Sequence, residues 1–214
     1  MQKRIIGLLQ GVAQHKNRHR VFEDFITIVA VCLHNQKAWF DKKREEEYLK
    51  VFNSYHKSDQ EAFTEAFGLL VMELGVEPKD VLGSIYMSME LGDSRNGQYF
   101  TPDNVSYLMA QFHLGDIYND LKDKDYISLS DPASGSGGMI LAVIKGMLEK
   151  GFNPSSNIWV QATDISRVAA LMCYIQLSLW GVPAQIIVGN SLSLEVREVW
   201  NTPIFLRGGW IYKQ

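Results

Sequence analysis

The strongest constraint on the fold is a glycine-rich segment, D-P-A-S-G-S-G-G, at residues 131–138. It follows a short β-type run, Tyr126–Leu129, and precedes a helical pattern over Met139–Lys150. Glycine at three of its last four positions lets the backbone turn sharply and approach a ligand closely. A strand, a glycine turn and a helix in this order are typical of an α/β fold.

Two further strand patterns follow, Ile158–Ala162 and Gln185–Val188, with an apolar helix over Ile165–Leu179 between them. Strands that alternate with helices imply right-handed crossovers and a parallel sheet. We therefore predict an α/β domain over residues 96–214.

The first 95 residues show only helical patterns. Apolar residues recur at spacings of three and four over 21–36, and a charged helix follows over 41–52 with Asp41 as its N-cap. The string S-D-Q-E at 58–61 has the form of a capping box, and a last helix runs from Lys79 to about Leu91. We predict an all-helical domain over residues 1–95.

Composition excludes several classes of protein. The chain has 214 residues, 46% hydrophobic and 21% charged, which is ordinary for a globular protein, and its net charge of -3 argues against a uniformly basic nucleic-acid binder. The apolar run Ile26–Leu33 is too short to span a membrane, and no signal peptide is visible, so we expect a cytoplasmic protein with no membrane partner. No Cys/His pair has zinc-ligand spacing, and no metal site is predicted.

Polar residues follow each predicted strand at the edge where open α/β sheets bind ligands. Asp131 would repel a pyrophosphate and suits a ligand with a cationic group. Asp164 could accept hydrogen bonds from ribose hydroxyls, or cap the next helix. Asn190 could meet an adenine edge, or simply form a turn. All three residues would lie at the same edge of the sheet, and this shared position favours a binding site.

A further element, G-Q-Y-F-T-P at 97–102, precedes the first strand, and its Thr-Pro pair suits a helix start. This element, then D-P-A-S-G-S-G-G, T-D-I at 163–165 and G-N-S-L at 189–192, in this order, resembles the adenine-N6 DNA methyltransferases, most closely the modification subunits of type I restriction systems. The resemblance covers roughly residues 80–192. It implies a Rossmann-like S-adenosylmethionine-dependent methyltransferase core, with a reduced parallel sheet, behind an all-helical N-terminal domain.

The resemblance implies S-adenosylmethionine as cofactor. It places the methionine part against residues 99–102 and the glycine loop, the ribose on Asp164, the adenine ring on Ile165 and the adenine edge on Asn190. The implied cofactor-binding residues are Tyr99, Phe100, Thr101, Pro102, Asp131, Ala133, Ser134, Gly135, Ser136, Gly137, Asp164, Ile165 and Asn190.

The catalytic signature of that family, N-P-P followed by Tyr or Phe, does not occur in this sequence. The nearest string is N-T-P-I at 201–204, in which Ile204 offers no aromatic face to a flipped base. We expect Asn201 to be a loop or helix-end residue, and we predict no catalytic residue. The segment 195–200 looks amphipathic rather than like a buried strand, whereas 204–206 could form a short fourth strand.

These observations predict an S-adenosylmethionine-binding protein that transfers, or helps to transfer, a methyl group to adenine in DNA, as in restriction-modification. The alternative is a catalytically inactive cofactor-binding module that acts as partner or regulator of a DNA modification enzyme. A nicotinamide-dependent oxidoreductase is disfavoured because G-x-G-x-x-G is absent. DNA is an expected partner, with the basic residues in 1–20 either touching phosphates or simply solvated. A second copy or a partner subunit is expected to cover the open edge of the sheet.

Overall fold

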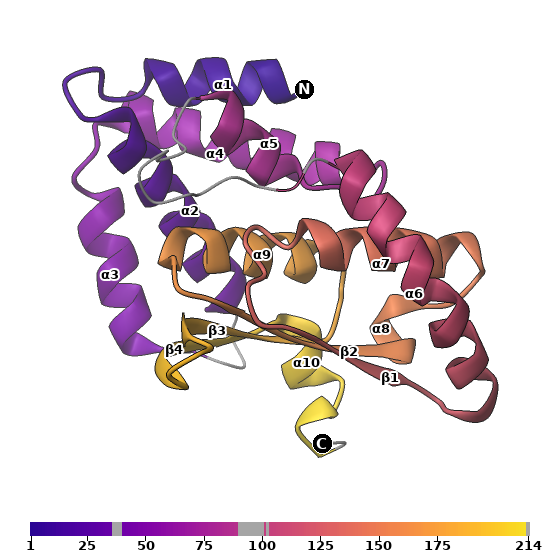
Figure 1. Cartoon of the computed structure of the whole chain (residues 1–214). Coiled ribbons are helices and arrows are strands. Elements are labelled where there is room, and N and C mark those ends of the chain that lie inside the picture. Colours follow the sequence, from indigo (N-terminus) through magenta and orange to yellow (C-terminus); the bar gives the residue numbers. More distant parts are fainter. Residues whose placement is uncertain (36–39, 90–100, 102, 213–214) are drawn as a thin grey trace.

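The computed structural model describes residues 1–35, 40–89, 101 and 103–212 (Figure 1). The N-terminal elements are α1 (Gln2–Gly11), α2 (Arg18–His34), α3 (Lys42–Phe52), α4 (Lys57–Leu74) and α5 (Val81–Ser88). The remaining elements are α6 (Asp103–Asp123), β1 (Ile127–Asp131), α7 (Gly138–Glu149), α8 (Pro154–Asn157), β2 (Ile158–Asp164), α9 (Arg167–Leu179), β3 (Ala184–Asn190), β4 (Glu195–Asn201), α10 (Pro203–Arg207) and a 3-10 turn at Trp210–Tyr212.

The sheet has the order β1-β2-β3-β4. The strands β1, β2 and β3 are parallel, as predicted, and β4 runs antiparallel to β3. In the register, Asp131 lies opposite Ala162 and Asp164 lies opposite Val188. The carboxyl ends of the three parallel strands therefore meet at one edge of the sheet.

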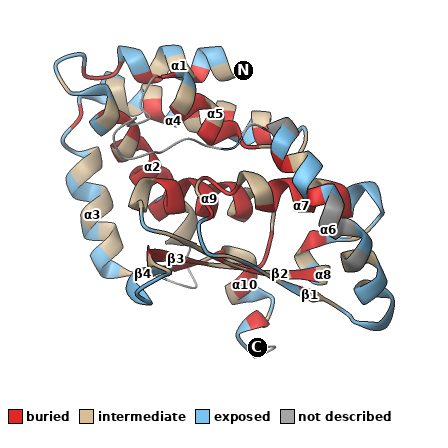
Figure 2. Ribbon diagram, viewed as in Figure 1, coloured by how far each residue is buried: buried red, intermediate tan, exposed pale blue. Residues whose placement is uncertain are grey.

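Helix α9 is the centre of the core. Figure 1 shows α7 and α9 between the sheet and the N-terminal helices, and Figure 2 shows how completely α9 is buried. Nine consecutive residues of α9, 169–177, are buried, because the helix packs on β2 and β3 on one side and on α2 on the other. An apolar helix with no solvated face is what such a sandwiched position requires.

The described part of residues 1–89 holds helices joined by short turns and no strand, as predicted. Asp41 caps α3, since its Oδ1 accepts hydrogen bonds from the backbone N–H groups of Lys43 (2.9 Å) and Arg44 (3.2 Å). The predicted boundary between residues 95 and 96 lies outside the described residues and stays a prediction. No helix in the described ranges is both long and apolar enough to cross a lipid bilayer.

The prediction of a capping box at residues 58–61 is wrong. Helix α4 already begins at Lys57, behind His56, whose side chain makes no capping hydrogen bond. The carboxylate of Asp59 instead accepts a hydrogen bond from the backbone N–H of Ala13 at 3.3 Å. This contact ties the first turn of α4 to the segment that follows α1.

The C-terminal segment also differs from expectation. Residues 195–201 form the strand β4, and residues 204–206 belong to the helix α10 rather than to a strand. The strand looked merely amphipathic because it lies at an edge and buries mainly Trp200. The side-chain hydroxyl of Thr202 donates to the carbonyl of Val182 (2.7 Å) and accepts from the N–H of Ala184 (2.9 Å), and Pro203 starts the helix. This strand covers the β3 edge, whereas β1 pairs, within the described chain, with β2 alone.

Candidate functional site

The glycine loop is fastened to the tip of β2. The carboxylate of Asp164 accepts the N–H of Gly135 on Oδ2 and the N–H of Ser166 on Oδ1, both at 2.8 Å. The N–H of Ser134 donates to the carbonyl of Thr163 at 3.0 Å. Asp164 therefore orients the loop and the start of α9 together. Each carboxylate oxygen has a second lone pair that can still accept a ligand hydroxyl.

Backbone geometry explains two of the glycines. Gly135 and Gly137 have φ angles of 54° and 92°, which side chains rarely tolerate. A Cβ at Gly137 would also lie 2.9 Å from the Sγ atom of Cys173 in α9. The glycine loop therefore packs closely against α9 at Gly137. Ala133, in the same loop, is exposed.

Two carboxylates lie near each other at the strand tips. Asp131 ends β1, and its Oδ1 accepts the N–H of Ala133 at 3.1 Å. Burial, followed by the negative charge of Asp164, raises the pKa of Asp131 above its ordinary value. Burial, together with the charges of Asp131 and Asp164, also raises the pKa of the Cys173 thiol beneath the loop. These two carboxylates favour a cationic ligand over a phosphate beside them.

Ile165 and Asn190 complete this edge. The side chain of Ile165 is 62% exposed, which is unusual for isoleucine and leaves an apolar face beside Asp164. The Oδ1 atom of Asn190 accepts the N–H of Leu192 (3.0 Å) and of Ser193 (3.4 Å), so this side chain forms the turn into β4. The expected contact of Asn190 with an adenine edge stays a prediction, and its amide nitrogen is the group that could make it.

Ser136 points away from this edge. Its side chain is 1% exposed and its hydroxyl donates to the Oδ2 atom of Asp80, so only its backbone could face a ligand. Sequence reasoning missed Asp80, and also Gln176, whose amide binds Asp80 at 3.0 Å. The available signal was Gln176 itself, an amide side chain within the mostly apolar run at 168–177.

The segment 97–102 is described only at Thr101, which is exposed. Tyr99, Phe100 and Pro102, which were expected to contact the methionine part of the cofactor, lie outside the described residues. Their role stays a prediction.

Asn201 lies at the other end of the sheet. Because β4 is antiparallel, Asn201 pairs with Gln185 at the start of β3, whereas Asp164 lies opposite Val188 near the end of β3. The side chain of Asn201 accepts a hydrogen bond from the Gln185 amide at 3.3 Å. Its placement agrees with a structural role at the end of a strand.

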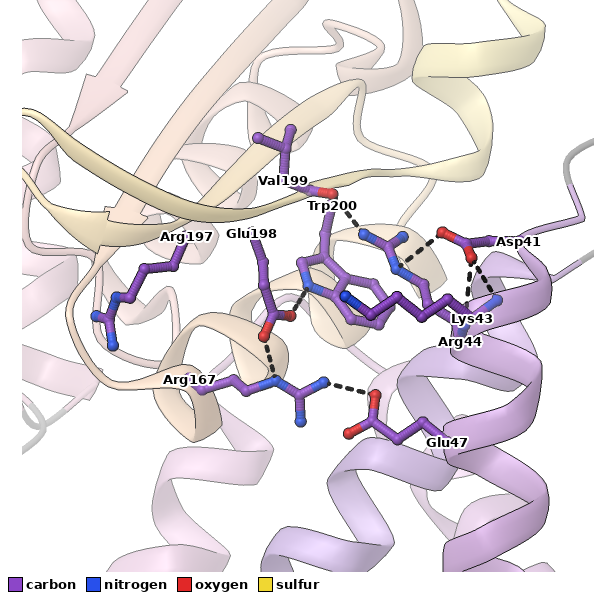
Figure 3. Close-up of a pocket in the computed structure, with 9 residues that line it drawn as sticks. All are labelled: Asp41, Lys43, Arg44, Glu47, Arg167, Arg197, Glu198, Val199 and Trp200. Atoms are coloured by element: carbon purple, nitrogen blue, oxygen red, sulfur yellow. Dashed lines mark hydrogen bonds and ion pairs between the residues drawn. The ribbon is translucent and has the colours of Figure 1, made fainter.

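A separate cavity of about 610 Å³ lies between α3 and β4 (Figure 3). The charged residues that line this cavity mostly form ion pairs or hydrogen bonds with one another. Arg167 pairs with Glu198 (2.8 Å) and with Glu47 (3.0 Å), and Arg44 lies over the ring of Trp200 and donates to the carbonyl of Val199. None of the predicted cofactor-binding residues lines this cavity, so we do not assign the cofactor to it.

We expect Asp131→Asn to stabilise the free protein and weaken binding of a cation. Because the pKa of Asp131 is raised in the folded state, its ionised form costs stability at neutral pH. That cost is absent below the unfolded-state pKa of about 3.9 and grows as pH rises through the folded-state value. The melting temperature of the variant should therefore exceed that of the wild type at pH 7 and converge with it near pH 3.5, as followed by circular dichroism.

The same variant should weaken the S-adenosylmethionine binding that the sequence predicts by roughly tenfold, a change of about 1.4 kcal/mol. S-adenosylhomocysteine, which lacks the sulfonium charge, should lose less affinity. Equal losses for both ligands would contradict the electrostatic explanation.

Two comparisons with known proteins found a similarity. Residues 77–203 match the family described as N-6 DNA methylase. A solved structure from Listeria monocytogenes, described as a class I S-adenosylmethionine-dependent methyltransferase, is 17% identical with a TM-score of 0.48, and the match covers 86% of this chain and 51% of that one. This chain thus spans about half the length of that protein. The comparison with curated proteins found no match. Because the family match extends over more than half of this chain's residues, the chain belongs to the N-6 DNA methylase family.

Proposed function

We propose that the chain binds S-adenosylmethionine across the tips of β1, β2 and β3 and acts in methyl transfer to the N6 amino group of adenine in DNA. The observation that carries this proposal is the pair of electrostatically coupled carboxylates, Asp131 and Asp164, beside the glycine loop. A nucleotide phosphate would be repelled there, whereas a sulfonium nucleoside is attracted. Membership of the family supports the same ligand.

The residues present fit this cofactor. Asp131 lies at the tip of β1, where its charge would favour a cation, and Asp164 retains lone pairs for ribose hydroxyls. The exposed side chain of Ile165 suits one face of an adenine ring. When bound, S-adenosylmethionine supplies an electrophilic methyl group. The protein holds and orients it at the strand tips.

A second candidate function is cofactor binding without turnover, as partner or regulator of a DNA modification enzyme. The position of Asn201 favours it, because that residue lies at the amino end of β3, away from the glycine loop. DNA as substrate, a second copy or partner subunit beside β1, a role in restriction-modification and a cytoplasmic location are all part of the proposal.

Two measurements on the purified chain separate these functions. Calorimetry with S-adenosylmethionine tests binding, and ligand at 100 times its dissociation constant should stabilise the fold by about 2.7 kcal/mol. Incorporation of labelled methyl groups into unmethylated DNA, compared with an Asp164→Ala control, tests turnover. Binding with incorporation supports the enzyme, and binding without it supports the second candidate. If calorimetry detects binding of neither S-adenosylmethionine nor S-adenosylhomocysteine, both candidate functions are rejected.

A further inference from the structure

A buried polar junction joins α5, the glycine loop and α9. Its side chains belong to Asp80, Ser136 and Gln176, which are 3%, 1% and 0% exposed. Burying a carboxylate and an amide is costly unless their hydrogen bonds are made. The side chains of Asp80, Ser136 and Gln176 all make such hydrogen bonds here.

The contacts hold Ser136 by both its side chain and its backbone. Asp80 accepts the Ser136 hydroxyl on Oδ2, and on Oδ1 it accepts the N–H of Gly83 (2.8 Å) and the amide of Gln176 (3.0 Å). The amide of Gln176 also donates to the carbonyl of Ser136 at 2.8 Å, and its oxygen accepts the N–H of Leu82 at 3.1 Å. The loop is thus tied to the first turn of α5 and to the last turn of α9.

The junction leaves no spare room. A Cβ on Gly83 would lie 2.6 Å from the hydroxyl of Ser136, and one on Gly138 would lie 3.4 Å from Oδ2 of Asp80 and 3.6 Å from the hydroxyl of Ser106. The starts of α5, α6 and α7 therefore meet around one carboxylate. In sequence, α5 and α6 flank the G-Q-Y-F-T-P segment, and the starts of both helices lie beside this junction.

We propose that Asp80 is a positioning residue of the cofactor site, which holds the glycine loop in its ligand-receiving conformation by gripping Ser136. The inference rests on the proposed function. Two carboxylates clamp adjacent loop residues, since Asp164 accepts the N–H of Gly135 and Asp80 accepts the hydroxyl of Ser136. Ordering a loop costs about 1–2 kcal/mol per residue, and a loop already ordered in the free protein spares that cost on binding.

Two variants remove the charge-assisted hydrogen bond between Ser136 and Asp80 with little other damage. In Asp80→Asn the amide nitrogen can only donate to the Ser136 hydroxyl. Asp80→Asn keeps a good N-cap oxygen for the N–H of Gly83 but loses the charge and one acceptor. Ser136→Ala keeps the loop backbone and deletes only the hydroxyl. Tyr55→Phe is a matched control, because the hydroxyl of Tyr55 donates to Oδ2 of the buried Asp24 at 2.7 Å, within the N-terminal helices.

Hydrogen exchange without cofactor tests the grip directly. Peptides that span residues 131–140 should exchange roughly tenfold faster in Asp80→Asn and in Ser136→Ala than in the wild type, since one charge-assisted hydrogen bond is lost. The dissociation constant for S-adenosylmethionine should also rise about tenfold in each single variant. It should rise no further in the double variant, because both changes break one contact. Tyr55→Phe should lower the melting temperature while leaving loop exchange and affinity unchanged.

A purely structural role would lower only the melting temperature. Unchanged loop exchange and unchanged affinity in folded Asp80→Asn and Ser136→Ala would overturn the inference. If the wild type bound no cofactor while loop exchange still rose in both variants, the proposed function would fail, and Asp80 would remain the residue that holds the loop for another ligand.

Discussion

The variant Asp164→Ala is expected to lose S-adenosylmethionine binding by at least about 100-fold, or roughly 2.7 kcal/mol. The carboxylate holds the N–H of Gly135 and the N–H of Ser166, both at 2.8 Å, so alanine releases the glycine loop and the start of α9 at once. It also removes the proposed acceptor for the ribose hydroxyls. Each charge-assisted hydrogen bond contributes about 1.5–3 kcal/mol, so losing several exceeds a tenfold effect. Isothermal calorimetry measures the loss.

The control for this experiment is Asp41→Ala. Asp41 accepts two backbone N–H groups at the start of α3, as Asp164 accepts two at the strand tip, but its carboxylate pairs with Arg44 of the same helix and not with the glycine loop. Losing that cap should cost about 1 kcal/mol of stability and leave cofactor affinity unchanged. An Asp164→Ala protein that is folded and binds the cofactor with wild-type affinity would refute the assignment of the strand tips as the site.

Local signals made most of the fold predictable. The switch from helical spacing to short apolar runs, and the glycine turn, marked β1, β2, β3, α7 and α9 within a few residues. The edge strand β4 escaped because it buries mainly Trp200 and therefore carries little of the apolar pattern of a parallel strand. The helix α10 could have been foreseen, since Thr202-Pro203 repeats the helix-start pattern seen in Thr101-Pro102.

The candidate site was predictable where topology dictates it. Parallel strands bring their carboxyl ends together, so Asp131 and Asp164 had to lie near each other once the sheet was recognised. The inward turn of Ser136 was not predictable, because it depends on Asp80, which is 56 residues away in sequence. Asn190 forms the turn into β4, which is one of its two predicted roles, whereas its contact with an adenine edge stays a prediction.

The largest effect on stability is expected for Trp200→Ala. Trp200 is fully buried, its ring centroid lies 5.3 Å from that of Tyr174 and 5.5 Å from that of His34, and the guanidinium of Arg44 lies 3.7 Å from it. Truncating a buried aromatic residue typically costs about 3–5 kcal/mol. In a chain of this length each kcal/mol lowers the melting temperature by roughly 2–4 °C. Chemical denaturation measures the change in the free energy of unfolding.

Two further variants show where that loss arises. Trp200→Phe keeps most of the ring but removes the Nε1–H that donates to Glu198 at 2.9 Å, so it should cost far less than alanine. Tyr212→Ala, at an aromatic side chain that is 90% exposed, should change stability by no more than about 0.5 kcal/mol. Because Arg44 belongs to α3 and Tyr174 to α9, Trp200 connects the N-terminal helices to the sheet edge, and its removal should lower the whole transition. A loss below about 1 kcal/mol, or a loss confined to a separate early transition, would show that β4 and α3 are not part of the common core.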